Sequence, residues 1–197
     1  MSRGQIIRWM LEEVGVEYEQ QIINYGEHMK SPEYLAINPM GKIPAIKHGD
    51  KVVTECAAIC AYLAVAFPEA GLAPKDEQMA DYHRWMFFAA GPLESAVINN
   101  AMGFNVDADQ ERMAGYGTYE VTIRTLDQWF ENNKYVCGDT FTAADVYVGA
   151  QIDWGMMFKT VTETDNFNAY AERLRARPAY IKAKKIDADL AATMQQS

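Results

Sequence analysis

The fold is decided by residues 38–64, whose sequence is NPMGKIPAIKHGDKVVTECAAICAYLA. Residues 43–47 and 51–53 are short runs that contain isoleucine and valine, and His48-Gly49-Asp50 between them is typical of a hairpin turn. From Thr54 onward, small and apolar residues predict a packed helix. The string therefore predicts two antiparallel strands that lead directly into a helix.

The residues before this string predict a helix, a strand and a second helix. Apolar side chains at helical spacing over residues 6–14 end at Gly15, a typical C-cap residue. Residues 16–23 favour a strand, and Ser31-Pro32 predicts a helix with proline in its first turn. Residues 1–66 are therefore expected to form a small α/β domain.

A linker and a helical segment follow the α/β domain. Residues 67–75 contain two prolines and one glycine, a composition that predicts a linker. Beyond it the strand pattern disappears, and apolar residues repeat at helical spacing in residues 79–97 and again in 116–130. We therefore expect residues 76–197 to form an all-helical C-terminal domain.

One helix start in this second domain is specified by Thr142 and Asp145. The threonine hydroxyl at the N-cap and the carboxylate at the third helical position are the two halves of a capping box, and Phe141 and Val146 suit a hydrophobic staple. Such a pair satisfies backbone amides that would otherwise lack partners at a buried helix end. Locally it is an ordinary structural cap, and its value is as a marker of the fold.

The composition excludes several classes of protein. With 49% apolar and 23% charged residues, the chain has the balance of a globular protein and not of a disordered one. Its net charge of −9 argues against nucleic-acid binding, which needs a basic surface. No apolar run is long enough for a membrane span, and no signal peptide is recognisable at the N-terminus. The three cysteines do not form a disulfide framework, so we expect a cytoplasmic protein.

These motifs together resemble those of the glutathione transferase superfamily. The resemblance covers residues 38–45 and 54–64, the segment Gly138–Asp145 that contains the capping box, and Arg177-Pro178-Ala179-Tyr180 near the C-terminus. It implies a thioredoxin-like α/β N-terminal domain followed by an all-α helical bundle. It also implies a homodimer that uses glutathione as co-substrate and needs no other cofactor.

The resemblance assigns the glutathione site to five residues. In the family the proline at the position of Pro44 follows a cis bond, and the backbone of the preceding residue, here Ile43, binds the cysteinyl part of glutathione. The carboxylate of Glu55 corresponds to the group that takes the ligand's ammonium. Cys56 stands where most members have a serine that binds the γ-glutamyl carboxylate, and Lys42 is in position to reach the glycyl carboxylate.

Each of these assignments has a simpler alternative. Pro44 on its own only interrupts a strand, and Lys42 on its own is a solvated surface lysine. Cys56 and Cys60 are one helical turn apart, which also fits a redox pair, although thiols at this spacing more often pack in a core. No histidine or cysteine spacing in the chain predicts a metal site.

The chain departs from the family pattern at its start. Family members open with a strand and a loop before the first helix, whereas here Met1 falls almost at that helix. Our hypothesis is that the natural chain begins upstream of Met1. Ser2, followed by Arg3, is the candidate catalytic residue in the sequence at hand; the alternatives are a catalytic residue upstream of Met1, and a plain N-cap role for Ser2.

Two function classes follow from the resemblance. The first is a glutathione transferase whose bound thiolate attacks small hydrophobic electrophiles, held in a pocket that includes Tyr82, Trp85 and Trp154. Those three side chains are equally compatible with the core or a dimer interface, and Trp85 with Phe88 suits a dimer face. The second class is a non-catalytic glutathione-binding or protein-interaction module on the same fold.

Overall fold

The computed structural model describes residues 2–194, and the chain divides into two compact units. The N-terminal unit comprises the residues up to Leu72 together with those from Arg177 onward, and the helical unit is Ala73–Ala176. This differs from the expectation that residues 76–197 form one domain. The last helix belongs with the first unit because its side chains pack against the first helix.

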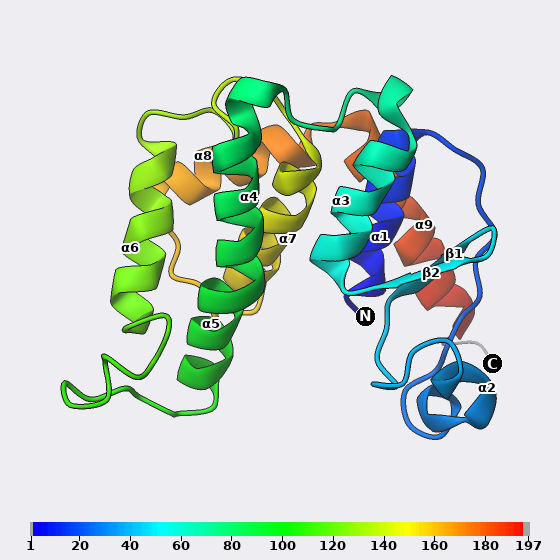
Figure 1. The fold of residues 1–197 in the computed structure, drawn as a ribbon, viewed down its shortest axis with the longest axis horizontal. Helices are drawn as coiled ribbons and strands as arrows, with labels where there is room; N and C mark the ends of the chain where they lie inside the picture. The colour runs from blue at the N-terminus through cyan, green and yellow to red at the C-terminus, as the bar shows by residue number, and fades with distance from the viewer. Residues whose placement is uncertain (1, 195–197) are drawn as a thin grey trace. The chain divides into compact units, whose positions relative to one another are not determined.

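The N-terminal unit contains four α-helices, a two-stranded sheet and short 3₁₀ turns (Figure 1). Its elements are α1 Gly4–Val14, η1 His28–Lys30, α2 Pro32–Leu35, β1 Ala45–His48, β2 Lys51–Thr54, α3 Cys56–Ala66, η2 Pro68–Ala70 and α9 Pro178–Met194. The C-cap predicted at Gly15 is confirmed, since this glycine has a φ of 77° and donates to the Leu11 carbonyl. Ser31 caps α2 by accepting from the Tyr34 N–H, as its sequence predicts.

The helical unit has no strand among its described residues, in agreement with the sequence. It consists of η3 Asp76–Gln78, α4 Met79–Phe88, the π-helical turn η4 Ala89–Leu93, α5 Glu94–Ala101, α6 Tyr119–Phe130, α7 Ala143–Met157 and α8 Asp165–Arg175. The apolar stretch 79–97 thus spans two α-helices joined by a π turn. Pro92 lies inside that turn, where its missing N–H disturbs the helical hydrogen bonding.

The predicted hairpin is present, and its register is simple. Ala45 pairs with Thr54 and His48 with Lys51, so that Gly49 and Asp50 form a two-residue turn. Gly49 has a φ of 62°, as required at the first central position of a type II′ turn. The following helix begins at Cys56 and not at Thr54, because Thr54 is still paired in the sheet.

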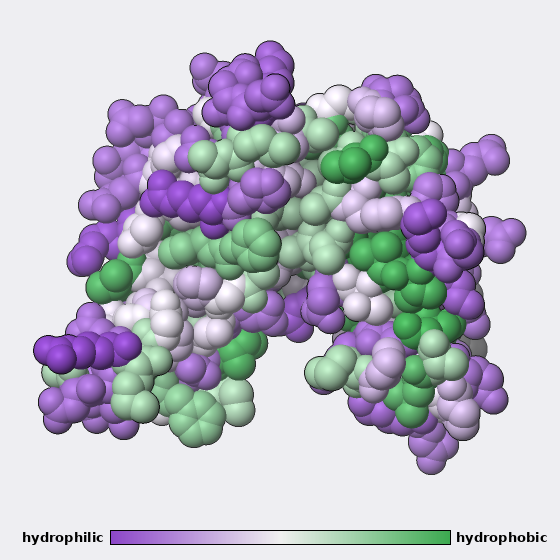
Figure 2. All heavy atoms as spheres, viewed as in Figure 1, coloured by the Kyte–Doolittle hydropathy of each residue, from purple (hydrophilic) through white to green (hydrophobic). Residues whose placement is uncertain are grey.

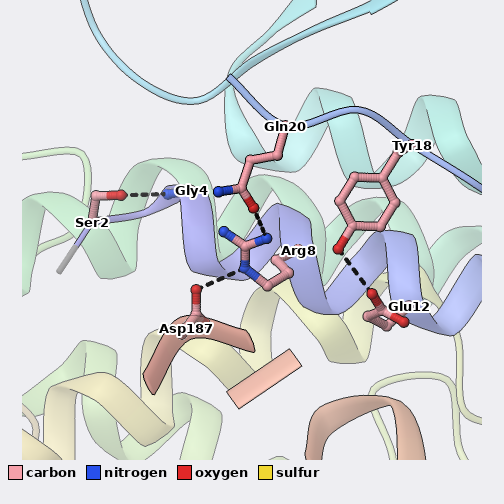
Figure 3. Close-up of polar contacts among 7 residues, drawn as sticks. All are labelled: Ser2, Gly4, Arg8, Glu12, Tyr18, Gln20 and Asp187. Carbon is pink, nitrogen blue, oxygen red and sulfur yellow. Dashed lines mark hydrogen bonds and ion pairs between the residues drawn. The ribbon is translucent and has the colours of Figure 1, made fainter. Parts of the chain in front are cut away.

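The strand expected at residues 16–23 is not observed, and this prediction was wrong for the described chain. These residues have no regular secondary structure. A strand is defined by hydrogen bonds to a neighbour, and no segment within residues 2–194 pairs with this one. Their polar contacts are instead with α1, through the Tyr18 hydroxyl to Glu12 and the Gln20 side chain to Arg8 (Figure 3).

Helix α1 forms the centre of the N-terminal unit, with α3 and α9 packed against it (Figure 1). Its buried residues are Ile6, Ile7, Trp9 and Met10. Three ion pairs tie α1 to the C-terminal segment. Arg177 donates to both carboxylate oxygens of Glu13 at 2.6 and 2.7 Å, Arg8 donates to Asp187 at 2.7 Å, and Lys182 pairs with Glu12 at 2.6 Å.

The capping box at the start of α7 is confirmed. The Thr142 N–H donates to Asp145 Oδ2 at 2.8 Å, while the Val136 N–H and the Tyr170 hydroxyl donate to Oδ1 at 2.7 and 2.8 Å. Despite these donors, complete burial raises the pKa of Asp145 to about 6. The cap therefore fastens α7 to α8 and to the preceding loop as well as closing its own helix end.

Candidate functional site

The N-terminus of α1 carries the candidate catalytic serine. Ser2 is half-buried, and its Oγ accepts a hydrogen bond from the Gly4 N–H at 3.2 Å (Figure 3). A serine hydroxyl that accepts in this way still has its own proton to donate. The geometry is therefore compatible both with a cap and with a group that donates to a ligand at the positive end of the helix.

The loop before β1 has the backbone that the resemblance implied. The Ile43–Pro44 bond is cis. Gly41 has a φ of 58°, and a Cβ at this position would lie 2.7 Å from Lys30 Nζ and 2.8 Å from the Met29 carbonyl oxygen. Only glycine fits there without displacement. The side chain of Lys42 is exposed, so it is available to a ligand.

The residue that precedes α3 has an unusual backbone conformation. Glu55 has φ 66° and ψ 123°, outside the regions that L-residues with a side chain normally occupy. Such a conformation costs about 1–3 kcal/mol and is concentrated at functional sites. The Glu55 side chain is exposed, while its carbonyl accepts from the Ile59 N–H and starts the helix. The carboxylate is thus presented to solvent at the N-terminus of α3.

The sheet register and one side-chain contact bring these segments together in the N-terminal unit. Because Ala45 pairs with Thr54, the preceding Pro44 comes next to the following Glu55. Cys56 then contacts the start of α1, with its Sγ 3.8 Å from the Arg3 carbonyl oxygen. The cis-proline loop, the start of α3 and the start of α1 therefore meet at one place.

The cysteines do not favour a redox pair. All three are buried thiols that take part in no disulfide among the described residues. Burial, and to a smaller extent the neighbouring Cys56, raises the pKa of the Cys60 thiol well above its ordinary value, so Cys60 stays protonated and unreactive. Cys137 lies in the helical unit, where burial raises its pKa to about 11. The packing alternative is therefore favoured for Cys60.

The side chains predicted for the electrophile pocket are mostly core residues. Tyr82 and Trp85 are only 4% and 1% exposed, whereas Trp154 is half-buried. Trp85 packs between Phe88 and Trp129, with Arg84 above its ring. Its burial within one chain contradicts the suggestion that it forms a dimer face. An apolar pattern on a single helix cannot separate a core position from a ligand contact.

Three side chains that were not predicted as site residues hold the loop before β1 in place. Lys30, Tyr34 and Asn38 donate hydrogen bonds to backbone carbonyls of residues 40–42. Only Asn38 carried a sequence signal, because asparagine before proline is frequent at turns. The other two donors, Lys30 and Tyr34, lie earlier in the chain. Whether their side chains can contact the carbonyls of residues 40–42 depends on the path of the backbone between them.

A separate cleft of about 980 Å³ lies in the same unit at the other end of α1. It is lined by residues from the end of α1, the following segment and the start of α9: Glu12, Glu13, Gly15, Val16, Glu17, Tyr18, Glu19, Pro178, Ala179 and Lys182. Two of its glutamates are already paired, Glu12 with Lys182 at 2.6 Å and Glu13 with Arg177. This cleft was not predicted from the sequence.

The described residues contain neither a candidate metal site nor a helix suited to span a membrane. Within residues 2–194, no three or more His, Cys, Asp or Glu side chains are grouped as a metal ion would require. None of the helices in that range combines the length and the apolar character needed to cross a bilayer.

Comparison with known proteins identifies the family. Residues 1–65 match the model of the glutathione S-transferase N-terminal domain, and residues 93–178 match that of the C-terminal domain. The chain belongs to the glutathione transferase superfamily. It is 28% identical to a glutathione S-transferase of Hyoscyamus muticus over 193 residues, which cover 88% of each chain. By this relationship the protein is an enzyme of the glutathione transferase type.

Solved structures agree on the fold. A glutathione transferase from Methylococcus capsulatus superposes with a TM-score of 0.77 at 24% identity, over 95% of this chain and 97% of that one. The theta class glutathione S-transferase of Xanthomonas axonopodis pv. citri, solved with glutathione bound, gives a TM-score of 0.70 at 24% identity, over 93% and 92% of the two chains. The fold of this superfamily member is thus shared along nearly its whole described length.

Proposed function

We propose that this protein binds reduced glutathione in its N-terminal unit and presents the ligand as a thiolate to small hydrophobic electrophiles. The observation that carries the proposal is the meeting of three segments: the loop at Ile43–Pro44, the start of α3 at Glu55 and Cys56, and the start of α1. Family membership supplies the ligand, and the glutathione bound to the related Xanthomonas enzyme supports it.

The chemistry of glutathione matches the groups at this place. Glutathione is an extended tripeptide with two carboxylates and one ammonium group. The backbone of Ile43 pairs with the cysteinyl part in the manner of an added strand. The Glu55 carboxylate takes the ammonium group, and the N-terminal amides of α3, starting with Cys56, take the γ-glutamyl carboxylate. Lys42 takes the glycyl carboxylate.

Replacing the usual serine by Cys56 weakens one contact without removing the site. A thiol is a poorer hydrogen-bond donor than a hydroxyl. The backbone N–H of residue 56 remains at the helix start and is unaffected by the exchange. We therefore expect glutathione binding that is somewhat weaker than a serine at this position would give.

Ser2 is the proposed activating residue. Its hydroxyl donates to the glutathione sulfur, and the N-terminus of α1 adds a favourable partial charge, so that the thiolate is stabilised relative to the thiol. The thiolate sulfur then forms a bond to the electrophilic carbon, and the leaving group departs with its electron pair. The proton is lost from the thiol to solvent on binding. No cofactor is needed besides glutathione as co-substrate.

The assembly and location are proposed from family membership, and exposed apolar surface supports the dimer. We propose a homodimer in the cytoplasm. Hydrophobic surface of the kind a dimer would cover is visible in Figure 2, and the exposed apolar side chains include Val65 in the N-terminal unit and Phe87 in the helical unit. Sedimentation at micromolar concentration tests the dimer, and a monomer there would contradict it.

The deciding experiment is a calorimetric titration with reduced glutathione at pH 7 and pH 8, in two buffers of different ionisation enthalpy. We expect saturable binding with proton release, which the difference between buffers reports, followed by turnover of a general electrophile such as 1-chloro-2,4-dinitrobenzene. Binding with neither proton release nor turnover would favour the non-catalytic module. Absence of binding by the folded protein would refute the proposal.

A further inference from the structure

Three successive carbonyl groups of the loop before β1 are held by side chains from one preceding segment. Lys30 Nζ donates to the carbonyl oxygens of Met40 and Gly41 at 3.0 and 3.2 Å. The next carbonyl, that of Lys42, accepts two hydrogen bonds, from the Tyr34 hydroxyl at 2.6 Å and from Asn38 Nδ2 at 2.8 Å. Four side-chain hydrogen bonds therefore fix the backbone of residues 40–42.

The two groups that donate to the Lys42 carbonyl are themselves firmly placed. Tyr34 is 6% exposed and Asn38 is 2% exposed. The Asn38 side chain also accepts from the Met40 N–H at 3.1 Å, which fixes which side of its amide faces Lys42. Burial raises the pKa of Tyr34, so its hydroxyl keeps its proton and remains a donor. Both donors are therefore ordered before any ligand arrives.

Holding the Lys42 carbonyl also fixes the next amide group. The C=O of Lys42 and the N–H of Ile43 belong to one planar trans peptide, in which they point in opposite directions. With the carbonyl turned toward Tyr34 and Asn38, the Ile43 N–H is turned away from them. Within residues 2–194 this N–H has no hydrogen-bond partner. It is an ordered donor without an acceptor, at the position where the proposed ligand needs one.

We infer that Tyr34 and Asn38 are positioning residues for glutathione, because their two hydrogen bonds to the Lys42 carbonyl orient the Ile43 N–H toward the cysteinyl part of the ligand. The inference rests on the proposed function. Neither side chain has to touch the ligand for this role. Loss of either donor lets the Lys42–Ile43 peptide rotate. Binding of glutathione must then order this peptide, and the entropy lost in doing so weakens the affinity.

The test compares Tyr34→Phe and Asn38→Asp with the wild-type protein. Tyr34→Phe removes one oxygen atom and leaves the buried ring in place. Asn38→Asp keeps the acceptor for the Met40 N–H but replaces the donor to Lys42 by a carboxylate oxygen. A hydrogen bond of this kind corresponds to about a 2- to 10-fold effect, so we expect the Kd and KM for glutathione to rise by that factor in Tyr34→Phe and further in Asn38→Asp.

The expected signature is a rise in KM for glutathione with kcat unchanged. The positioned amide contributes to ligand binding, whereas thiol activation depends on the start of α1. The matched control is Tyr62→Phe, which removes a hydroxyl that bonds His48 Nδ1 at 2.8 Å in the same unit. The control should bind glutathione as the wild type does. Thermal melting of all variants checks that they are folded. The ¹⁵N–¹H signal of Ile43 during a glutathione titration reports directly on the proposed contact.

The outcomes separate this inference from the proposed function. If the wild-type protein fails to bind reduced glutathione, both are overturned. If the wild type binds and Tyr34→Phe and Asn38→Asp bind as tightly as Tyr62→Phe, only the positioning role is overturned. A fall in kcat with KM unchanged also contradicts it. Since Asn38→Asp places a charge in a buried position and risks misfolding, Tyr34→Phe alone suffices for the decision.

Discussion

The buried carboxyl of Asp145 makes the stability of this protein depend on pH in a definite direction. Its pKa is about 6 in the folded chain, against 3.8 for an ordinary aspartate, because removal from water outweighs the hydrogen bonds it accepts. A group with a raised folded pKa binds its proton more tightly in the folded state. Its contribution is complete below the unfolded pKa and is lost as the pH rises through the folded pKa.

The size of the effect follows from the gap between these two values. A difference between 3.8 and about 6 corresponds to about 3 kcal/mol. Asp145→Asn removes the titration and keeps the shape of the side chain. The free energy of unfolding of the wild type minus that of the variant should therefore fall by about 2 kcal/mol between pH 4 and pH 7, because part of the full contribution is already lost at pH 4, and it should stay level above pH 7.

Denaturant unfolding of the wild type and of Asp145→Asn at each pH gives this difference. The pH dependence that all other titratable groups contribute to stability is the same in both proteins and cancels. Tyr170→Phe serves as a second variant. The Tyr170 hydroxyl donates to Asp145 Oδ1 and thereby lowers the pKa of the carboxyl. Its removal should raise that pKa, so the midpoint of the pH-dependent loss of stability should move to higher pH. A difference that is constant with pH, or that grows as the pH rises, would refute the reasoning, since the hydrogen bonds would then outweigh burial.

Three further predictions concern the candidate site. Ser2→Ala should lower kcat/KM for conjugation about 100-fold with little change in the Kd for glutathione, and unchanged turnover would reduce Ser2 to a helix cap. Glu55→Gln should weaken glutathione binding about tenfold but leave binding of an analogue without the ammonium group unaffected, as calorimetry can establish. Gly41→Ala should destabilise the protein by about 1–3 kcal/mol in denaturant unfolding, whereas the control Gly115→Ala, in open space, should not.

Local chemistry made part of this structure predictable from the sequence. Gly15 ends α1 and the Gly49 turn sets the hairpin register, because both depend on backbone preferences of single residues. The capping box of Thr142 and Asp145 is likewise a matter of near neighbours along the chain. The candidate site was assigned from the resemblance to the family, which could be recognised because its motifs on either side of the hairpin are short and local.

What could not be predicted depends on contacts distant in sequence. Residues 16–23 have the composition of a strand, but a strand exists only where another backbone pairs with it. The apolar pattern that contains Tyr82 and Trp85 is the same whether the helix packs in a core or lines a ligand pocket. Only the burial of these side chains in the structure identifies them as core residues. The donors Lys30 and Tyr34 depend on the path of the chain between η1 and β1.

The return of α9 to α1 determines the order in which the chain can fold during synthesis. The N-terminal unit draws its partners from both ends of the sequence: Glu13 pairs with Arg177, and Arg8 with Asp187. The helical unit is one uninterrupted stretch, Ala73–Ala176. On the ribosome, therefore, the helical unit can complete its contacts before the N-terminal unit does. Helix α3 can already pack against α1, but the part of α1 that contacts α9 stays uncovered until α9 is translated.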